Sequence, residues 1–381
     1  MITRIRHALL APAVAAAVAF VVSSIALMIS GNNPLTAFAE MWKSIDSIDA
    51  VVAIINRATP YYVAGVAVAI GFKMNLFNIG ANGQYILATL LAAAAGAAVS
   101  LPPVLHVTMI LVIAVVVGAA WAAIAGVLKV TRGVNEVIST IMLNYIATGI
   151  TAFLVAEYLR NKAVDLVAET KPLPKSAQLP PLNRLFELVG LDLPEGVVLQ
   201  GFLPFAVALG IGYHLMLNRS RFGYHLRVSG TTPAAARTAG INPKVMVLAT
   251  IVLSGAVAGL IGMSGLLADP QFHKYGDQFP KSLGFTGISL ALLGRNHPGG
   301  IAAAALVWAT IERATQRLSP FGIPQEIGVI LQGSFLLAAV IAFEVVQRSN
   351  EEAATRAAAR AAAARVPEPI VTGPGSAGVT T

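Results

Sequence analysis

The amide side chains that lie within apolar runs are the residues of this sequence whose types best suit a functional site. Asn75, Asn78, Asn82 and Gln84 lie close together in one such run. An amide carries both donors and an acceptor, and burying one in hydrocarbon without partners costs several kcal/mol. Polar residues persist in membrane spans mainly where they face protein or a water-filled path. The cluster therefore predicts either a lining that hydrogen-bonds a polar solute or helix contacts held by amides.

If the run is one continuous helix, the spacing of these amides places them on two different faces. Asn75, Asn78 and Asn82 stand at i, i+3 and i+7 and so share one helical face, while Gln84 points elsewhere. On the functional interpretation, this face lines a cavity. On the alternative, the amides join helices and the neighbouring glycines allow those helices to approach closely.

Two further amides are candidates for the same path. Asn144 lies about two turns into another apolar run, where it would meet either a solute or a neighbouring helix. Asn56 precedes Arg57 near the expected outer end of a run, with Pro60 a turn later as a kink. Asn56 and Arg57 would contact a solute or partner at the outer opening, or Arg57 would simply extend to the lipid headgroups.

Catalytic and metal-binding constellations are missing from the sequence. It has no cysteine, and its six histidines are scattered without a pair at metal-ligand spacing. Neither His-Glu-x-x-His nor Gly-x-Ser-x-Gly occurs, and there is no Gly-x-x-x-x-Gly-Lys-Ser/Thr phosphate loop. The sequence thus predicts no metal, no cofactor and no enzymatic activity of its own.

The composition indicates an all-α, polytopic membrane protein. Of the 381 residues, 56% are hydrophobic and only 12% are charged, whereas soluble domains carry about 25% charged residues. The apolar residues also come in long blocks. The net charge of +8 is spread over loops and ends, which fits the excess of positive residues on the cytoplasmic side of membrane proteins rather than a nucleic-acid-binding groove.

About ten segments have the roughly 20 mostly apolar residues that a membrane span needs. They are residues 8–29, 51–72, 74–98, 104–128, 137–159, 199–217, 246–268, 282–295, 299–318 and 323–345. The eighth is the weakest, because glycines interrupt a short run that suits a re-entrant segment. An even number puts both termini on one side, and the distribution of Lys and Arg predicts that both are cytoplasmic. The first run is longer than the apolar core of a signal peptide, so we expect an uncleaved helix.

These spans form one predicted transmembrane domain, residues 1–345. Within it, 160–198 is proline-rich and predicts an external loop with little regular structure. Residues 346–381 form a predicted cytoplasmic tail. Its Ala/Arg-rich first part suits a helix, and its Pro/Gly/Ser/Thr-rich end suits disorder.

The basic segment 218–245 is the strongest candidate for a docking element. Proline at the start and glycine at the end predict a short helix over 233–239, and such a helix between two spans suits contact with a cytoplasmic partner. The alternative is a basic loop that only fixes orientation. The candidate docking residues are Arg227, Ala234, Ala235, Ala236, Arg237 and Gly240.

Two glycine-broken segments in different halves of the chain form a faint internal echo. Residues 77–83 follow Lys73, and residues 285–294 follow Lys281. Transporters often contain duplicated halves with interrupted helices. The likeness between these segments is short, and chance explains it equally well.

Together these stretches resemble a known family. FNIGANGQ at residues 77–84 and GVNEVISTIMLNY at residues 133–145 look like the permease subunits of bacterial ABC importers for ribose, simple sugars and branched-chain amino acids. Nucleoside and simple-sugar permeases are the most similar members. Residues 226–241 are similar to the cytoplasmic coupling segment of that family. The resemblance covers roughly residues 50–345.

This resemblance implies a multi-pass permease in the bacterial inner membrane that provides the path for a nucleoside or sugar. It also implies three protein partners: a cytoplasmic ATP-binding subunit, a second permease chain that is like or unlike this one, and an external substrate-binding protein. Membrane lipid would surround the permease. One departure is Ala234, which stands where the coupling signature often has glutamate, so a charge contact at that position is in doubt.

An ion-coupled secondary transporter is the alternative function. Such transporters commonly bury acidic residues near the bilayer midplane as cation or proton ligands. Here Glu136, Glu312 and Glu344 all lie toward the expected ends of spans. The sequence therefore favours the importer permease, and it leaves the solute itself unidentified.

Overall fold

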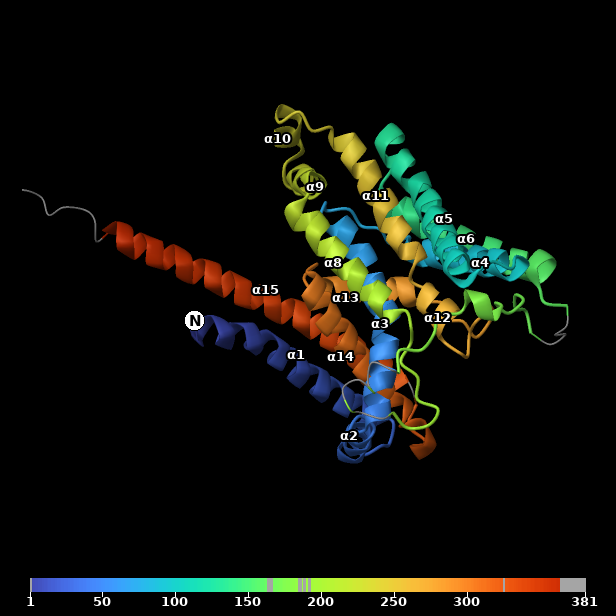
Figure 1. The fold of residues 1–381 in the computed structure, drawn as a ribbon. Coiled ribbons are helices and arrows are strands. Elements are labelled where there is room, and N and C mark those ends of the chain that lie inside the picture. The colour runs from blue at the N-terminus through green and yellow to red at the C-terminus, as the bar shows by residue number, and fades with distance from the viewer. Residues whose placement is uncertain are drawn as a thin grey trace, which may run out of the picture. The chain divides into compact units, whose positions relative to one another are not determined.

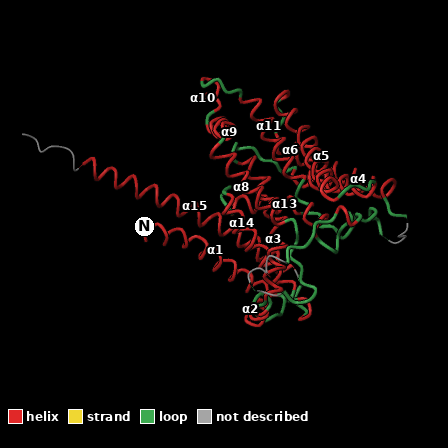
Figure 2. The backbone as a smooth tube through the Cα atoms, in the orientation of Figure 1, coloured by secondary structure: helices red, strands yellow, loops and turns green. Residues whose placement is uncertain are grey.

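The computed structural model describes residues 2–162, 167–183, 187, 190, 193–324 and 326–363, and this part of the chain is built from helices. Figure 2 shows helices joined by loops throughout. Within the described residues, β structure is limited to one isolated bridge between Glu169 and Gly276. The all-α prediction is thus confirmed.

The helices follow one another along the whole chain (Figure 1). The first half contains α1 (Ile2–Ile29), α2 (Pro34–Lys43), α3 (Ile48–Phe72), α4 (Ala81–Ala98), α5 (Pro103–Arg132), α6 (Glu136–Leu154) and the π turn η1 (Val155–Leu159). The second half contains α8 (Leu203–Arg219), α9 (Arg221–Thr231), α10 (Pro233–Thr238), α11 (Pro243–Gly259), α12 (Met263–Ala268), α13 (Leu283–Leu293), α14 (Pro298–Gln316) and α15 (Glu326–Ala363). Two single 3-10 turns, η2 (Lys175–Ala177) and η3 (Ser319–Phe321), lie in connecting segments.

The chain separates into two compact units. One comprises Met1–Val22 with Gly333–Thr381, and the other comprises Ser23–Gln332. Every candidate site residue belongs to the larger unit. In the tail, α15 continues to Ala363, as its Ala/Arg-rich composition predicts, and the predicted disordered end lies outside the described residues.

Helix starts are marked by residues that suit them chemically. The side chains of Asn33, Asn135 and Asn242 accept backbone N–H groups at the starts of α2, α6 and α11. These bonds satisfy donors that the first helical turn leaves open. Proline occupies the first turn of α5 and α11, where its missing N–H costs nothing.

A helix lies within each of the ten predicted spans, but only some of these helices suffice to cross a membrane. By length and hydropathy five do: Ile48–Phe72, Pro103–Arg132, Glu136–Leu159, Pro243–Ala268 and Glu326–Val345; counting α1 with α2 as one span would add a sixth. The count of ten and the orientation therefore stay predictions. At 11 residues α13 measures about 16 Å, roughly half the hydrocarbon thickness, so it does not cross alone.

Helices α5 and α11 run antiparallel and touch through their backbones. A Cβ placed on Gly118 would lie 2.3 Å from the carbonyl oxygen of Gly255, and one placed on Gly259 would lie 2.0 Å from that of Ala114. Only glycine permits such an approach, which is the usual way that helices pack inside a membrane. We name the end of the larger unit at which α5 ends and α11 begins the α10 end. The opposite end, at which α5 begins, is named the cavity end.

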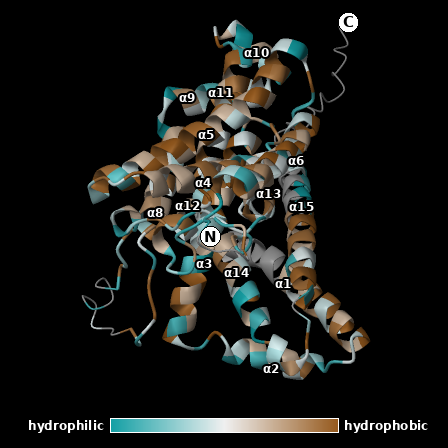
Figure 3. Cartoon of the chain, turned by 90° about the vertical axis from the view of Figure 1, so that its right-hand side faces the viewer, coloured by the Kyte–Doolittle hydropathy of each residue, from teal (hydrophilic) through white to brown (hydrophobic). Residues whose placement is uncertain are grey.

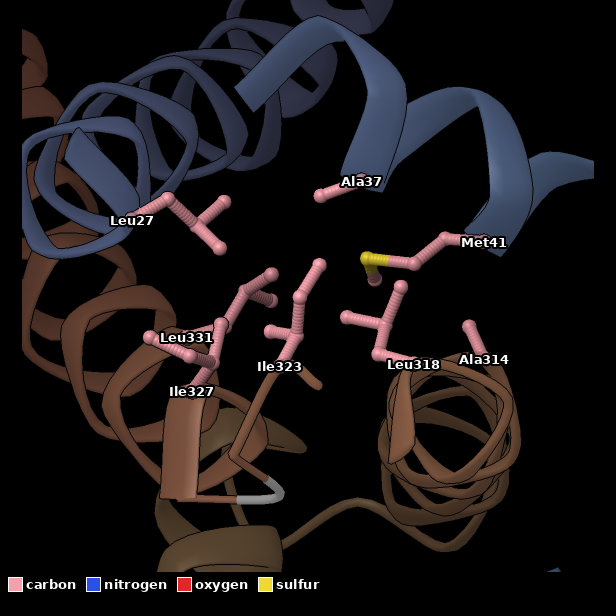
Figure 4. Close-up of a cluster of buried hydrophobic side chains, with 8 residues drawn as sticks. All are labelled: Leu27, Ala37, Met41, Ala314, Leu318, Ile323, Ile327 and Leu331. Carbon is pink, nitrogen blue, oxygen red and sulfur yellow. The ribbon is translucent and has the colours of Figure 1, made fainter. Parts of the chain in front are cut away.

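The other helices of the larger unit pack around this pair. Helix α3 lies against α11, α13 and α14, while α4 packs between α5 and α6. A separate apolar cluster joins α1, α2, α14 and the start of α15 (Figure 4). It consists of Leu27, Ala37, Met41, Ala314, Leu318, Ile323, Ile327 and Leu331.

Hydrophobic residues dominate the helices, while hydrophilic ones gather in the connecting segments (Figure 3). Val112 and Val116 on α5, and Met142 and Ile146 on α6, are large, apolar and exposed. In water a surface of this kind would be a liability, whereas in a bilayer it meets lipid.

Candidate functional site

The amide cluster surrounds a break in the helical backbone. Helix α3 ends at Phe72 and α4 begins only at Ala81, so the intervening residues are not helical. The predicted single helical face for Asn75, Asn78 and Asn82 is therefore wrong. The run is apolar enough for a helix, but Asn75 adopts a positive φ of 55° and the amides replace the lost backbone hydrogen bonds.

Asn78 and Gln84 bond to each other and to α11. The amide of Asn78 donates to the Gln84 oxygen at 2.9 Å and to the Ser254 hydroxyl at 2.8 Å, and the Gln84 amide donates back at 3.0 Å. The Ser254 hydroxyl in turn donates to the carbonyl of Ala67 on α3. All three polar side chains are buried, so this network joins the break to α3, α4 and α11.

Asn144 of α6 completes the backbone of the same break. Its side-chain oxygen accepts the N–H of Gly83 at 2.7 Å, and its amide donates to the carbonyl of Ile79 at 2.9 Å. A Cβ on Gly83 would lie 2.9 Å from the Asn144 Cα, so glycine is required there. Asn144 therefore supplies both a donor and an acceptor to backbone groups that the interrupted helix leaves open.

Asn82 connects the break to the residues just before α13. Its amide donates to the carbonyl of Lys281 at 2.9 Å, and a Cβ on Gly284 would lie 2.4 Å from the Asn82 Cα. The Tyr85 hydroxyl also donates to the carbonyl of Pro280. The break is thus in direct contact with residues 280–284, which immediately precede the second segment of the internal echo. The side-chain oxygen of Asn82 is buried and meets no hydrogen-bond partner in the described part of the chain.

Asn75 lies apart from the other amides, at the α10 end. Its amide donates to the carbonyl of Gly230 on α9 at 2.9 Å. A Cβ on Gly230 would lie 2.7 Å from the Met74 Cα, so α9 rests directly on the start of the break. Partial burial, with the nearby charges of Arg227 and Arg295, lowers the pKa of Lys73 in this region.

Asn56 borders a cavity of about 490 Å³ at the opposite end of the larger unit, and the wall of this cavity combines polar and apolar groups. Its amide donates to the carbonyl of Val198, and its oxygen accepts the N–H of Gln200, which fixes the end of the proline-rich loop to α3. The wall contains polar residues that sequence reasoning missed, namely Asp49, Gln200, Asp269, Gln271 and Arg313. It also contains the aromatic rings of Phe272 and Phe279. Their separation in sequence gave no signal that they would meet.

Two pairs of charged side chains lie at this cavity. Glu312 accepts hydrogen bonds from the Arg57 guanidinium and the Tyr61 hydroxyl, and Arg313 lies 3.6 Å from the Asp49 carboxylate. Arg57 therefore does not simply extend to headgroups. The Nε atoms of Arg57 and Arg313 are buried and lack a partner among the residues described.

The predicted docking helix is confirmed as a helix. It is α10, Pro233–Thr238, and it is followed by Gly240 at a φ of +74°. Figure 1 shows α9 and α10 together at one end, beside the start of α11. Ala234, Ala235, Arg237 and Gly240 are exposed, whereas Ala236 is buried.

Arg227 has a contact within the chain. Its guanidinium donates to the carbonyl of Leu217 at the end of α8, which ties α9 to α8. The exposed surface offered by this segment is therefore mainly α10 and the turn at Gly240.

This arrangement suits the binding of a polar solute. In the described part of the chain no three His, Asp or Glu side chains gather as a metal site would require. Donors, acceptors and aromatic rings do converge on a cavity at one end, while an exposed helix marks the other. Such a layout can hold a polar solute and receive a protein partner.

Comparison with known proteins identifies the family. The branched-chain amino acid transport system / permease component family matches residues 50–340. Guanosine ABC transporter permease protein NupP of Bacillus subtilis is 30% identical over 331 residues, covering 86% of this chain and 91% of NupP. Glucose ABC transporter permease protein TsgB13 of Haloferax volcanii is 29% identical, covering 86% of this chain and 85% of the relative. Nucleoside ABC transporter permease protein NupB of Lactococcus lactis subsp. cremoris is 26% identical, covering 88% and 91%. The chain therefore belongs to the branched-chain amino acid transport system permease family and is a multi-pass membrane permease subunit of an ABC transporter.

Proposed function

We propose that this permease serves an importer of nucleosides or simple sugars and that its solute crosses by alternating access. The match to a guanosine permease over 86% of the chain carries this proposal. Relatives named for nucleoside and glucose transport support the same solute class. All of these solutes bear several hydroxyl groups, which need donors and acceptors along the path.

In this proposal the cavity bordered by Asn56 is the outer opening of the path. Buried donors on Arg57 and Arg313 and acceptors on Asp269 and Gln271 suit hydroxyl groups, and Phe272 offers a ring face. Asn82 borders the path deeper in the molecule with its unpartnered oxygen. Asn78, Gln84 and Asn144 shape the path by holding the helix break in place, and Asn75 connects that break to α9.

The α10 end is, in this proposal, the cytoplasmic docking surface for an ATP-binding subunit. Membership of the family implies such a subunit and a substrate-binding protein. Closure of the ATP-binding subunits would push on Ala234, Ala235 and the turn at Gly240, and α9 would pass the movement to the break through Asn75. A second permease chain, like or unlike this one, would complete the transmembrane part. ATP hydrolysis would occur on the separate subunit.

Uptake of labelled solute tests this function. Cells that lack the transporter and receive its complete set of genes are expected to accumulate labelled guanosine or ribose, and an ATP-binding subunit unable to hydrolyse ATP should abolish that uptake. This permease alone in liposomes should neither hydrolyse ATP nor concentrate solute. Gradient-driven uptake by the isolated permease would establish the ion-coupled alternative instead.

Co-purification tests the docking surface. Ala235→Trp places a bulky ring on the exposed face of α10 and is expected to reduce association with the ATP-binding subunit by about tenfold. Leu101→Trp is the matched control, because Leu101 is also exposed but lies in the loop between α4 and α5 at the cavity end. Unchanged association of the Ala235→Trp variant would rule out α10 as the dock.

A further inference from the structure

A second, smaller cavity lies between α4, α6 and the non-helical segment before α13. It measures about 280 Å³, close to the lower end of the roughly 300–1,000 Å³ usual for small-molecule sites. Its wall includes Ile86 of α4, Thr151 and Ala152 of α6, and Tyr275, Asp277 and Lys281 of the non-helical segment. A cavity of this size suits a single sugar ring better than a larger ligand.

One hydroxyl in this wall is left without a partner. Thr151 is 5% exposed, and its hydroxyl meets no acceptor or donor among the residues that the structure describes. Threonines in helices usually donate to the carbonyl four residues earlier, as Thr140 and Thr148 of the same helix do. A buried polar group without a partner carries a free-energy cost, and a ligand hydroxyl in the cavity would remove it.

The segment 275–281 separates this cavity from the larger one. Phe279 and Pro280 line the larger cavity, whereas Tyr275, Gly276 and Lys281 line the smaller. The Tyr85 hydroxyl and the Asn82 amide both donate to carbonyls of this segment. The second buried and unpartnered oxygen of the region, that of Asn82, thus lies against the same partition.

We propose that the smaller cavity is a second solute-binding site, which takes the hydroxylated ring of a sugar or nucleoside after the solute has left the larger cavity. The proposal rests on the proposed function, because it places a further station on the same path. Thr151 contacts a ring hydroxyl, and the ion pair of Lys281 with Asp277, 3.1 Å apart, borders the site. Movement of the segment 275–281 connects the two cavities.

Uptake kinetics of the complete transporter test the site. Thr151→Val keeps the side-chain shape and removes the hydroxyl. Loss of one neutral hydrogen bond is expected to lower kcat/KM for labelled guanosine or ribose about fivefold, mainly through KM. Thr151→Ser retains the hydroxyl and should restore kcat/KM to within about twofold of the wild-type value. The control is Thr310→Val on α14, because the Thr310 hydroxyl donates to the carbonyl of Leu306 at 2.8 Å and Thr310 lies outside the walls of both cavities.

The outcomes separate the two proposals. If wild type takes up neither guanosine nor ribose, the proposed function fails. If wild type transports and Thr151→Val matches Thr310→Val, the second site fails while the function stands. Because the chain has no cysteine, Thr151→Cys provides an independent measurement. A small methanethiosulfonate reagent should modify it, and guanosine or ribose should slow that reaction. Modification unaffected by solute would also overturn the proposal.

Discussion

Asn144 illustrates how one side chain can replace the backbone hydrogen bonds that a helix break leaves open. The peptide groups of Ile79 and Gly83 lie inside the protein, where water is not at hand to satisfy them. An amide offers a donor and an acceptor a short distance apart, and both are used here. The residue thus has a structural task that a simple pore lining would not require.

Asn144→Ala is expected to destabilise the permease. The substitution leaves the N–H of Gly83 and the carbonyl of Ile79 unpaired, at about 1–3 kcal/mol for each group. We therefore expect the melting temperature in detergent to fall by roughly 5 °C or more. Tyr145→Ala is the control, since Tyr145 is adjacent but 74% exposed. Equal melting temperatures for the two variants would contradict the bracing role of Asn144.

Glu312 accepts hydrogen bonds from both Arg57 and Tyr61, and its ion pair with Arg57 predicts strong coupling between these two charged side chains. Glu312→Ala leaves the guanidinium partly buried without its carboxylate, so uptake and stability should both fall. Arg57→Met should lower the stability of the Glu312→Ala variant less than it lowers the stability of the wild type. The difference between the two losses, the coupling energy, should be about 1 kcal/mol or more. The check is a double-mutant cycle on thermal stability; simple additivity would show that the pair contributes nothing.

At this scale the sequence indicated which residues matter but not their partners. The amide types at 78, 82, 84 and 144 marked a polar region inside an apolar run, and the structure does place these four residues together. Thr151 gave no signal, because a lone helical threonine ordinarily bonds to its own helix. Asp269 and Gln200 come from distant loops, so only the fold brings them to the cavity.

The break between α3 and α4 is the element that joins the two ends of the larger unit. One side of it rests on α9 through Met74 and Asn75, and the other holds the segment before α13 through Asn82. A displacement of α9 would therefore reach the partition between the two cavities through a few hydrogen-bonded residues. In the proposed mechanism, this contact makes the break the route by which α9 is coupled to the segment before α13.

Gly230→Val tests that route. Its new side chain would overlap Met74, since a Cβ alone would lie 2.7 Å from the Met74 Cα. We expect the complex to assemble and hydrolyse ATP while solute uptake falls about tenfold. Gly212→Val is the matched control on α8, because a Cβ there meets nothing within 4 Å. If uptake and ATP hydrolysis fall in proportion, the contact is structural rather than a coupling route.

Local sequence signals predicted an element well where proline or glycine marked its ends. Proline at 233 and glycine at 240 gave α10 almost to the residue. Between 74 and 98, by contrast, the apolar run is continuous and a helix was the natural expectation. The break depends on contacts from Ser254 and Asn144, which local sequence signals do not include.

The larger unit has the cavity and the proposed docking helix α10 at opposite ends of one set of helices, of which α5 and α11 are antiparallel. The proposed orientation makes a direct prediction in a chain without native cysteines. Ala235→Cys should react with a membrane-impermeant maleimide only after the cytoplasmic side is opened. Leu101→Cys should react while the inner membrane is intact, once the outer envelope has been made permeable to the reagent. The reverse pattern of reactivity would show that the orientation in the membrane is the opposite of the one proposed.

The backbone contact between α5 and α11 limits how this protein can change shape. Two helices that touch through Gly118 and Gly255 have no layer of side chains between them to rearrange. We therefore expect α5 and α11 to move together as one rigid body during a transport cycle. The non-helical segments, such as the break between α3 and α4, would then bend. Hydrogen–deuterium exchange should accelerate in those segments during turnover, while α5 and α11 stay protected.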